Sequence, residues 1–383
     1  MRDAVIVEAV RSPVGKREGG LSGLHPADLS AQILGALAER AGIDPVVVDD
    51  VVWGCVNQVG EQTFDIARTA VLSAGWPESV PGTTVDRQCG SSQQAVSFAA
   101  AGVIAGHYDV VVAGGVESMS RIPLGSAQLP GMSPLGNEYA RRYGPGFPNQ
   151  GLGAEEIALR WKLDRAAVDS YALQSHARAA AAVDEGRFDA QIHPIAGPDG
   201  TATERDEGIR RGGTLESLGR LRTAFREDGV ITAGNSSQIS DGAAALLITT
   251  SATAAELGLR PLARVHTSAV SGSEPTIMLT GPLPATHKAL ERSGLTLHDI
   301  GVFEVNEAFA SVPLAWMAEF DVDPAKVNPL GGAIALGHPL GGSGARIMTT
   351  LVHHMRDNGI RYGLQTMCEG GGQANATILE LID

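Results

Sequence analysis

Residues 36–56 read ALAERAGIDPVVVDDVVWGCV, and residues 289–309 read ALERSGLTLHDIGVFEVNEAF. Both stretches follow the same plan: an amphipathic helix ends at a glycine, a short linker contains an aspartate, and an apolar strand follows. Gly42 and Gly294 stand where the end of a helix favours a residue in the left-handed conformation. Because the two copies lie far apart in the chain, the sequence predicts two duplicated halves and not a solenoid of short repeats.

A second pair of stretches continues the repeat. Residues 107–120 (HYDVVVAGGVESMS) and 360–374 (IRYGLQTMCEGGGQA) each run as a strand into consecutive glycines. Each follows a predicted helix that opens at a glycine-rich turn, CGSSQQAVSFAAAGVIAG in the first half and GGSGARIMTTLVHHM in the second. Strands that alternate with helices are typical of the α/β class, and the run VVVAGGV predicts a strand buried on both faces.

Residues 119–239 differ in character from the two halves. They contain turn-rich stretches, a basic piece and one clear helical region, AEEIALRWKLDRAAVDSYALQSHARAAAAVDEG. We interpret this segment as an insertion, after which 240–251 (SDGAAALLITTS) returns to the first half as its last strand. The predicted division is therefore an N-terminal half of residues 1–118 plus 240–261, an inserted loop domain of residues 119–239, and a C-terminal half of residues 262–383.

Composition limits the classes of function. The 383 residues include 43% hydrophobic and only 4% aromatic residues, with 48 glycines, which predicts a large core of small side chains. The net charge of −14 argues against a general attraction to nucleic acid or to an anionic membrane. No apolar run approaches the ~18 residues of a membrane span, and we detect no secretory signal. Three cysteines without a CxxC motif favour a reducing cytoplasm over a disulfide framework or a zinc site.

Four positions carry groups that can do chemistry. Cys89 precedes a predicted helix, Asn306 lies in NEAFA, His338 lies in GGAIALGHPLGGSGAR, and Cys368 lies in MCEGGG. Each is predicted at a strand end or a helix start, where α/β folds bind ligands. Proline and glycines shape a rigid loop around the imidazole, and the three glycines after Cys368 suit backbone N–H groups that stabilise an oxyanion.

Several readings of these groups compete. A lone cysteine is commonly a buried small hydrophobe, which is the interpretation for Cys55 in VVWGCV. A redox dithiol would normally use a close CxxC, whereas Cys89 and Cys368 are far apart in the chain. One thiolate could take an acyl group from a thioester while the second thiol moves a proton next to a carbonyl. We expect a helix N-terminus or an adjacent imidazole to lower the pKa of the nucleophile, Cys89.

Taken in order, the motifs resemble those of one family. The stretches that carry the resemblance span the whole chain and are RQCGSSQQA, GGVESMS, TAGNSSQISDGAAA, NEAFA, GGAIALGHPLGGSGAR and CEGGG. The chain resembles the thiolases, which transfer acyl groups between 3-ketoacyl-CoA and coenzyme A or run the reverse Claisen condensation. The resemblance implies two βαβαβαββ halves in a layered α-β-α-β-α core, with a loop domain inserted in the first half.

The resemblance also implies roles for the residues. Cys89 would carry the acyl group, His338 would activate it, and Cys368 would act as acid and base at the substrate α-carbon and the CoA thiol. Asn306 would hold a water that binds one thioester oxygen together with His338. The backbone N–H groups of Cys89 and Gly370 would form the other oxyanion hole. The mechanism would be ping-pong, with coenzyme A as a substrate and without a metal or a permanently bound cofactor.

Coenzyme A carries phosphates, so an acidic chain needs a local basic patch. The insertion contains four arginines within a short stretch: Arg210, Arg211, Arg220 and Arg222. Such a run can also be a solvated basic face. The resemblance implies that Arg210 and Ser217 contact the nucleotide end of CoA, that Ser237 binds the pantetheine arm, and that Phe309 lines its tunnel.

The sequence departs from the short-chain thiolases at one point. Those enzymes carry a His-Met-Gly stretch where this chain has Asn149 and Gln150. The departure argues against acetoacetyl-CoA as the substrate. The stretches PNQ and QISDGAAA resemble those of thiolases that act on longer or bulkier 3-ketoacyl-CoAs, including the sterol-catabolic branch in actinobacteria. A condensing enzyme of the ketoacyl synthase type and a non-catalytic thiolase-like lipid-binding protein are the alternatives. By resemblance, the partner of the chain is a second copy, in a homodimer or a homotetramer.

Overall fold

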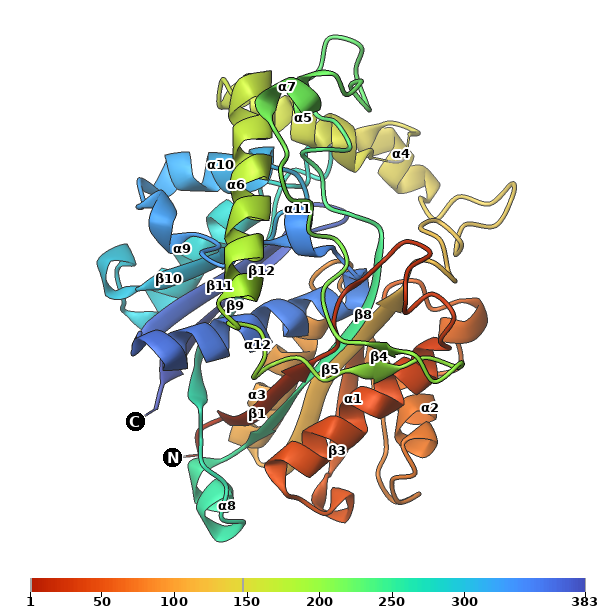
Figure 1. Ribbon diagram of the computed structural model, residues 1–383, viewed down its shortest axis with the longest axis vertical. Coiled ribbons are helices and arrows are strands. Elements are labelled where there is room, and N and C mark those ends of the chain that lie inside the picture. Colours follow the sequence, from red (N-terminus) through yellow and green to blue (C-terminus); the bar gives the residue numbers. More distant parts are fainter. Residues whose placement is uncertain (1, 147, 383) are drawn as a thin grey trace.

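The computed structural model describes residues 2–146 and 148–382 (Figure 1). Within these residues the main sheet has ten strands, nine of them in the order β10-β11-β12-β9-β1-β8-β5-β3-β4, and β2 (Gly15–Lys16) pairs with β8. The first half consists of β1 (Val5–Arg11), α1 (Pro26–Ala41), β3 (Asp50–Gly54), α2 (Ile66–Ser73), β4 (Thr83–Val85), α3 (Ser91–Ala105), β5 (Val110–Ser118) and β8 (Ser240–Thr249).

The second half repeats this order. After α8 (Ser251–Glu256), it consists of β9 (Ala263–Gly272), α9 (Pro282–Ser293), β10 (Val302–Val305), α10 (Ser311–Phe320), α11 (Ala333–Leu336), α12 (Leu340–Asn358), β11 (Tyr362–Glu369) and β12 (Gln373–Leu381). In place of β4 there is a single parallel bridge between Phe303 and Val327. In both halves the strands toward the outer end of the sheet pair in parallel, and the strands toward its middle pair antiparallel.

The two halves meet at a short seam. Val5 and Ile6 of β1 pair antiparallel with Arg264 and Ala263 of β9, which makes one continuous sheet of the two half-sheets. The predicted α/β class with a duplicated plan is confirmed. The domain boundaries drawn from the sequence stay a prediction.

Helices cover both half-sheets and fill the space between them. Side chains of α1 and α2 pack on one face of the first half-sheet, and those of α9 and α10 pack on the outer face of the second. Between the half-sheets, α3 and α12 bury their apolar side chains together with Ile6, Ile248 and Val302. Figure 1 shows α12 crossing the middle of the molecule between the two halves. The order of layers is therefore α-β-α-β-α, which is the predicted arrangement.

Glycines let these central layers approach closely. A Cβ added to Gly341 would lie 2.4 Å from the carbonyl oxygen of Val116, and one added to Gly344 would lie 2.3 Å from the backbone nitrogen of Gln93. Larger side chains there would push α12 away from β5 and α3. The small-residue composition of the sequence thus has a direct structural reason.

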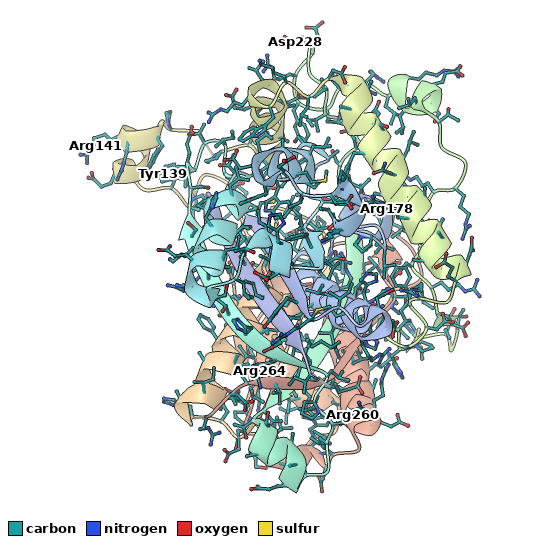
Figure 2. The ribbon with its side chains drawn as sticks, turned by 90° about the vertical axis from the view of Figure 1, so that its left-hand side faces the viewer. Tyr139, Arg141, Arg178, Asp228, Arg260 and Arg264 are labelled. Carbon is teal, nitrogen blue, oxygen red and sulfur yellow. The ribbon has the colours of Figure 1, made fainter. Side chains whose placement is uncertain are left out.

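The chain between β5 and β8 lies outside the main sheet. Its elements are α4 (Asn137–Tyr143), α5 (Gln150–Arg160), α6 (Arg165–Asp184), β6 (Ile195–Ala196), β7 (Ala202–Thr203) and α7 (Leu215–Gly219). Glu307 lies just after β10. Its carboxylate accepts hydrogen bonds from Tyr171 and Ser175 of α6 at 2.9 and 2.7 Å, and these bonds hold α6 against the second half. In Figure 2, Tyr139 and Arg141 on α4 project from the side of the molecule. Among the described helices, none is both long enough and apolar enough to cross a bilayer.

Candidate active site

All four predicted chemical groups lie at the ends of regular elements. Cys89 directly precedes Gly90, the N-cap of α3, and Asn306 follows β10. His338 lies between α11 and α12. Cys368 is the last but one residue of β11 and pairs with Ala374 of β12. All four side chains are buried, with relative exposures of 5% or less.

The motifs converge although they are distant in the sequence. Cys89 packs in one cluster with Leu340, which opens α12, and with Met367, which precedes Cys368. The two thiols are near enough for Cys89 to influence the pKa of Cys368 electrostatically, after the larger effect of burial. A Cβ added to Gly370 would lie 2.9 Å from Oε1 of Gln88, so the glycine turn after β11 lies against the turn before α3.

The turn that carries Cys89 is held in an unusual conformation. Gln88 has a positive φ of 50°, which is costly for a residue other than glycine. The hydroxyl of Ser91 donates to the carbonyl of Gln88 at 2.6 Å and accepts from the backbone of Arg87 at 2.9 Å. The backbone of Gln88 also donates to Asp86 at 2.6 Å. These bonds fix the thiol at the start of α3.

Hydrogen bonds decide which nitrogen of His338 carries the proton. The hydroxyl of Ser343 donates its one proton to the carbonyl of Pro339 at 2.8 Å. Ser343 Oγ must therefore accept the bond from Nδ1 of His338, which is 2.6 Å long, so Nδ1 is protonated. The lone pair then lies on Nε2, which is 3.5 Å from Nδ2 of Asn306. Oδ1 of Asn306 is buried without a hydrogen-bond partner among the described residues, so amide and imidazole both have capacity for a further polar group.

Burial sets the charge state of these groups. Burial, with a smaller effect of Arg346, lowers the pKa of His338 to about 3, so the imidazole is neutral and can act as a base. The expectation of a lowered pKa at Cys89 is wrong. Burial raises the pKa of Cys89 to about 12, and the negative charges of Glu369 and Glu117 add to the rise. The reason is that the loss of water around a thiolate outweighs the helix N-terminus, and the neighbouring imidazole is uncharged.

Two of the predicted CoA contacts lie close to the cluster that contains Cys368. Phe309 belongs to the same apolar cluster as Cys368. The backbone of Ser237 donates to the carbonyl of Ala308 at 2.9 Å, and Ser236 bridges to Phe309. Ser237 is half-buried at this position.

The other two predicted CoA contacts lie further out on the insertion, at exposed positions. The backbone of Arg210 donates to His176 on α6, and its side chain is exposed. Ser217 forms a capping box with Thr214 at the start of α7, which gives its hydroxyl a structural role. Of the neighbouring arginines, Arg211 pairs with Asp184 and Arg220 with Glu216.

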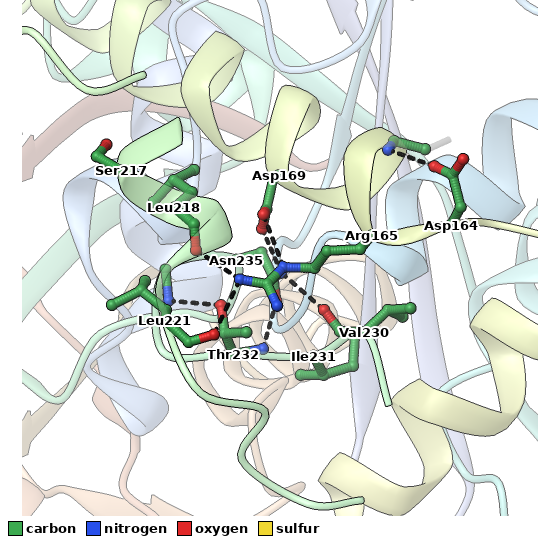
Figure 3. A network of polar contacts seen from close by, with 12 residues as sticks. Asp164, Arg165, Asp169, Ser217, Leu218, Leu221, Val230, Ile231, Thr232 and Asn235 are labelled. Carbon is green, nitrogen blue, oxygen red and sulfur yellow. Dashed lines mark hydrogen bonds and ion pairs between the residues drawn. The ribbon is translucent and has the colours of Figure 1, made fainter. Parts of the chain in front are cut away.

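A polar network holds this outer loop on α6 (Figure 3). Arg165 donates to the carbonyls of Leu218 and Leu221 and pairs with Asp169 at 2.7 Å. Asp169 in turn accepts from Asn235 at 2.8 Å, two residues before Ser237. The network therefore connects the loop of Ser217 with the inner contact at Ser237.

The structure adds residues that the sequence reasoning missed. Phe225 packs edge-on against Phe309, with 5.9 Å between ring centroids. Ser343 fixes the tautomer of His338, and its place in the first helical turn after the histidine was a usable signal. Glu369, adjacent to Cys368, lies against Gly90 in the turn that carries Cys89. The acidic residue in CEGGG was a usable signal, because a neutral side chain would pack more easily at a buried position. Across 2–146 and 148–382, no group of three or more His, Cys, Asp or Glu side chains is placed to hold a metal ion.

Comparisons with known proteins agree with the geometry. Residues 4–252 match the family model of the thiolase N-terminal domain, and residues 259–381 match that of the thiolase C-terminal domain. A relative named steroid 3-ketoacyl-CoA thiolase FadA6, from Mycobacterium tuberculosis, is 49% identical over 99% of this chain and 94% of its own length.

Two further relatives extend this range. A protein named 3-ketoacyl-CoA thiolase from Pseudoalteromonas translucida is 45% identical, and one named beta-ketoadipyl-CoA thiolase from Escherichia coli is 44% identical. Both matches cover the whole of this chain and of the relative. The resemblance seen in the sequence motifs is confirmed: the chain belongs to the thiolase family.

Proposed function

We propose that the protein is a thiolase that cleaves 3-ketoacyl-CoAs with bulky apolar acyl groups, using coenzyme A, by a ping-pong mechanism. Three observations support this proposal: the thiols of Cys89 and Cys368 are buried, Cys89 packs against Leu340 two residues after His338, and the imidazole of His338 is neutral. An imidazole with a free Nε2 can accept the proton of a thiol, whereas a protonated imidazole could not.

The first half-reaction forms the acyl-enzyme. Sγ of Cys89 attacks the 3-keto carbonyl as its proton passes to Nε2 of His338. The bond between the α- and β-carbons then breaks, and acetyl-CoA leaves as an enolate that takes a proton from Cys368. The backbone N–H groups of Cys89 and Gly370 stabilise the oxyanion on the acyl carbon, while Asn306, through a water, and His338 stabilise the enolate oxygen.

The second half-reaction releases the shortened acyl group. Coenzyme A replaces acetyl-CoA and gives its thiol proton to the Cys368 thiolate. The CoA sulfur attacks the acyl carbon on Cys89, and His338 returns its proton to the departing sulfur of Cys89. Both thiols must be reduced for these steps, and all three cysteines are free, so we place the enzyme in the cytoplasm. On the binding side, we assign the nucleotide end of CoA to Arg210 and Ser217 and the pantetheine arm to Ser237 and Phe309.

The surroundings of Cys368 support an apolar acyl group. The cluster around this thiol contains hydrophobic residues from α5, from the loop before β8, from the loop after β9, from the loop between β10 and α10, and from α10: Ala154, Ile157, Ile231, Ile277, Met278, Leu279, Ala308, Phe309, Val312 and Ala315. The buried carboxyl of Glu155 accepts hydrogen bonds from Val230 and Ile231 beside this cluster. Its position disfavours a substrate with a terminal carboxylate, such as a 3-ketoadipyl group. The steroid in the name of the Mycobacterium relative is in keeping with a bulky apolar substrate.

A kinetic panel tests this proposal. Thiolysis is followed as loss of the enolate absorbance for acetoacetyl-CoA, a long linear 3-ketoacyl-CoA, 3-ketoadipyl-CoA and a sterol-derived 3-ketoacyl-CoA. We expect kcat/KM for the bulky apolar substrates to exceed that for acetoacetyl-CoA by about tenfold or more, because each buried methylene adds about 1 kcal/mol. A preference for acetoacetyl-CoA or 3-ketoadipyl-CoA would contradict the substrate assignment only. No turnover of any substrate by folded protein, or rapid CO₂ release from malonyl-CoA, would contradict the reaction itself.

The surface also suits self-association. Strand β4 ends the order of the main sheet, and the adjacent helix α3 exposes Phe98 and Ile104 by 48% and 47%. Edge strands and exposed apolar side chains are typical of interfaces. We assign this face to a homodimer, with a homotetramer as a pair of such dimers, and light scattering of the purified protein tests it. A monomer at micromolar concentration would contradict the assignment.

A further inference from the structure

The carboxyl of Glu369 is buried directly beneath the turn that carries the nucleophile. Glu369 is fully buried and follows Cys368 in β11. A Cβ added to Gly90 would lie only 1.9 Å from Oε1 of Glu369. The carboxyl is therefore in contact with the backbone of the residue next to Cys89.

Within residues 2–146 and 148–382, no hydrogen bond of normal geometry reaches this carboxyl, and the nearby backbone N–H of Asn375 has only the smallest of the effects on its pKa. Neither oxygen of Glu369 has a hydrogen-bond partner among the described residues. Two donors in the vicinity are directed elsewhere, since Nη1 of Arg87 donates to Gln373 at 2.9 Å and Nδ2 of Asn375 donates to the carbonyl of Gly90 at 3.1 Å. Nε of Arg87 is buried without a partner among the described residues, and it makes no hydrogen bond to Glu369. A buried carboxylate without hydrogen bonds is costly, so the neutral acid is favoured.

A second buried acid near Cys89 shows the contrast. The carboxylate of Glu117 accepts hydrogen bonds from the backbones of Val56, Asn57 and Gly341 and from the side chains of Asn57 and Gln62. With five donors, the carboxyl of Glu117 is saturated with hydrogen bonds and has a structural role. Glu369 lacks such donors, and so its charge can change without loss of a network.

The groups that face Glu369 come from three elements. Burial raises the pKa of Glu369 to about 8, and Asp86 before α3 adds to the rise. Arg87 and the nearby backbone of Asn375 in β12 act in the opposite direction. The carboxyl in turn raises the pKa of Cys89, after burial, and acts in the same direction on Cys368. Glu369 therefore titrates close to neutrality beside two thiols that do not.

We propose that Glu369 is a positioning residue whose charge controls the nucleophile: neutral, it permits Cys89 to ionise, and ionised, it opposes the thiolate and slows acylation. The inference rests on the proposed function, because it concerns the same cysteine. The proton of Glu369 is lost to solvent and not to the substrate, so the residue takes no part in bond making. An alkaline decline in acylation would belong to this carboxyl, since a thiol alone becomes more reactive as pH rises.

The rate of alkylation of Cys89 by iodoacetamide tests the proposal without any thioester. The full-length protein is labelled between about pH 6.5 and 9.5, and the Cys89 peptide is quantified by mass spectrometry. For the wild type we expect the logarithm of the rate to rise with pH and to bend downward near pH 8, where Glu369 ionises. For Glu369→Gln we expect an unchanged rate at the acid end, no bend, and a rate about tenfold higher at the alkaline end, which corresponds to one pKa unit of Cys89.

Two variants assign the bend to this residue. Glu369→Asp keeps an ionisable carboxyl and should keep the bend. Glu304→Gln removes another buried glutamate whose pKa burial raises to about 8. Since the acids that raise the pKa of Cys89 are Glu369, Glu117 and Asp86, this variant should also keep the bend.

The outcomes separate the two proposals. A straight wild-type profile would overturn the role of Glu369, and this result needs no variant to fold. The role would equally be overturned by a bend that persists in Glu369→Gln or that disappears in Glu304→Gln. If the alkylation profiles behave as expected but no 3-ketoacyl-CoA is cleaved, the proposed function fails while the role of Glu369 stands.

Discussion

At the scale of single residues, burial acts on the thiols and on the imidazole in opposite directions. It raises the pKa of Cys89 and of Cys368 and lowers that of His338. All three groups are therefore uncharged before substrate binds, because a low-dielectric site disfavours every charged form. Proton transfer from Cys89 to His338 would create two charges at once. It becomes favourable only when a bound substrate offers a carbonyl carbon to which Sγ of Cys89 can bond.

Removing either thiol should have distinct effects. Cys89→Ser should abolish the acyl-enzyme, because a serine hydroxyl is a far weaker nucleophile beside the same imidazole. Cys368→Ala should still form the acyl-enzyme slowly, since that thiol acts on the leaving enolate. Mass spectrometry of the intact protein after mixing with a 3-ketoacyl-CoA measures both. A normal burst in Cys89→Ser would refute the assigned roles.

The hydroxyl of Ser343 should matter through His338. Ser343→Ala removes the acceptor that holds Nδ1–H at 2.6 Å, so the ring loses its fixed tautomer and orientation. We expect kcat to fall about tenfold or more with little change in KM or melting temperature, because general-base catalysis depends on that orientation. Ser343→Thr, which keeps the hydroxyl, is the matched control and should recover part of the activity. An unchanged kcat in Ser343→Ala would show that Ser343 does not orient the base.

At the scale of elements, the central helices depend on close backbone contacts. The start of α12 lies against β3 and β5, where a Cβ on Gly341 would approach the carbonyl of Val116 at 2.4 Å and the Cα of Cys55 at 2.7 Å. Both neighbours are backbone atoms, which cannot rotate aside. The same turn of α12 follows His338, so packing of this helix and position of the base are coupled.

Substituting Gly341 by alanine should therefore destabilise the protein. We expect Gly341→Ala to cost about 1–3 kcal/mol of unfolding free energy and to lower activity, as overpacking does. Gly35→Ala is the matched control, because Gly35 is also inside a helix but has no atom within 4 Å of the added Cβ. That change should leave stability equal or slightly higher. Urea unfolding followed by circular dichroism compares them, and equal stabilities would contradict the close-contact argument.

At the scale of the whole molecule, a buried ion pair ties the insertion to the first half. Arg11 of β1 contacts Asp206, which follows β7, through two nitrogens at 2.7 and 3.0 Å, and both side chains are fully buried. Asp206 also accepts from the backbone of Val14, and the guanidinium of Arg11 lies 5.0 Å from the ring of Phe188. The pair thus joins three stretches that are distant in the sequence.

Breaking this pair should be costly. Asp206→Ala leaves the Arg11 guanidinium buried without its carboxylate, for which we expect a loss of about 3–5 kcal/mol of unfolding free energy. Asp184→Ala removes the partner of Arg211 in an exposed pair and should leave stability nearly unchanged, because water screens such a pair. Thermal unfolding of both variants checks the difference. Similar melting temperatures would mean that the buried pair does not hold the insertion in place.

Much of the fold followed from local pattern. Periodicity and glycine positions depend only on neighbours in the chain, and they predicted three features correctly. These are the helix ends at Gly42 and Gly294, the helix and strand that recur in 36–56 and 289–309, and the buried strand 110–118. The seam between β1 and β9 had no such signal, because pairing of two distant strands leaves no mark in either one alone.

For the candidate site, the sequence by itself determined which groups are present and that they lie at the ends of elements: Cys89, Asn306, His338, Cys368 and the glycines around them. Only the tertiary structure decided how those groups are charged. Three features depend on which atoms replace water around a side chain: the raised pKa of Cys89, the tautomer of His338 set by Ser343, and the scarcity of hydrogen bonds to the Glu369 carboxyl among the described residues. Those atoms come from segments hundreds of positions apart, and only packing brings them together.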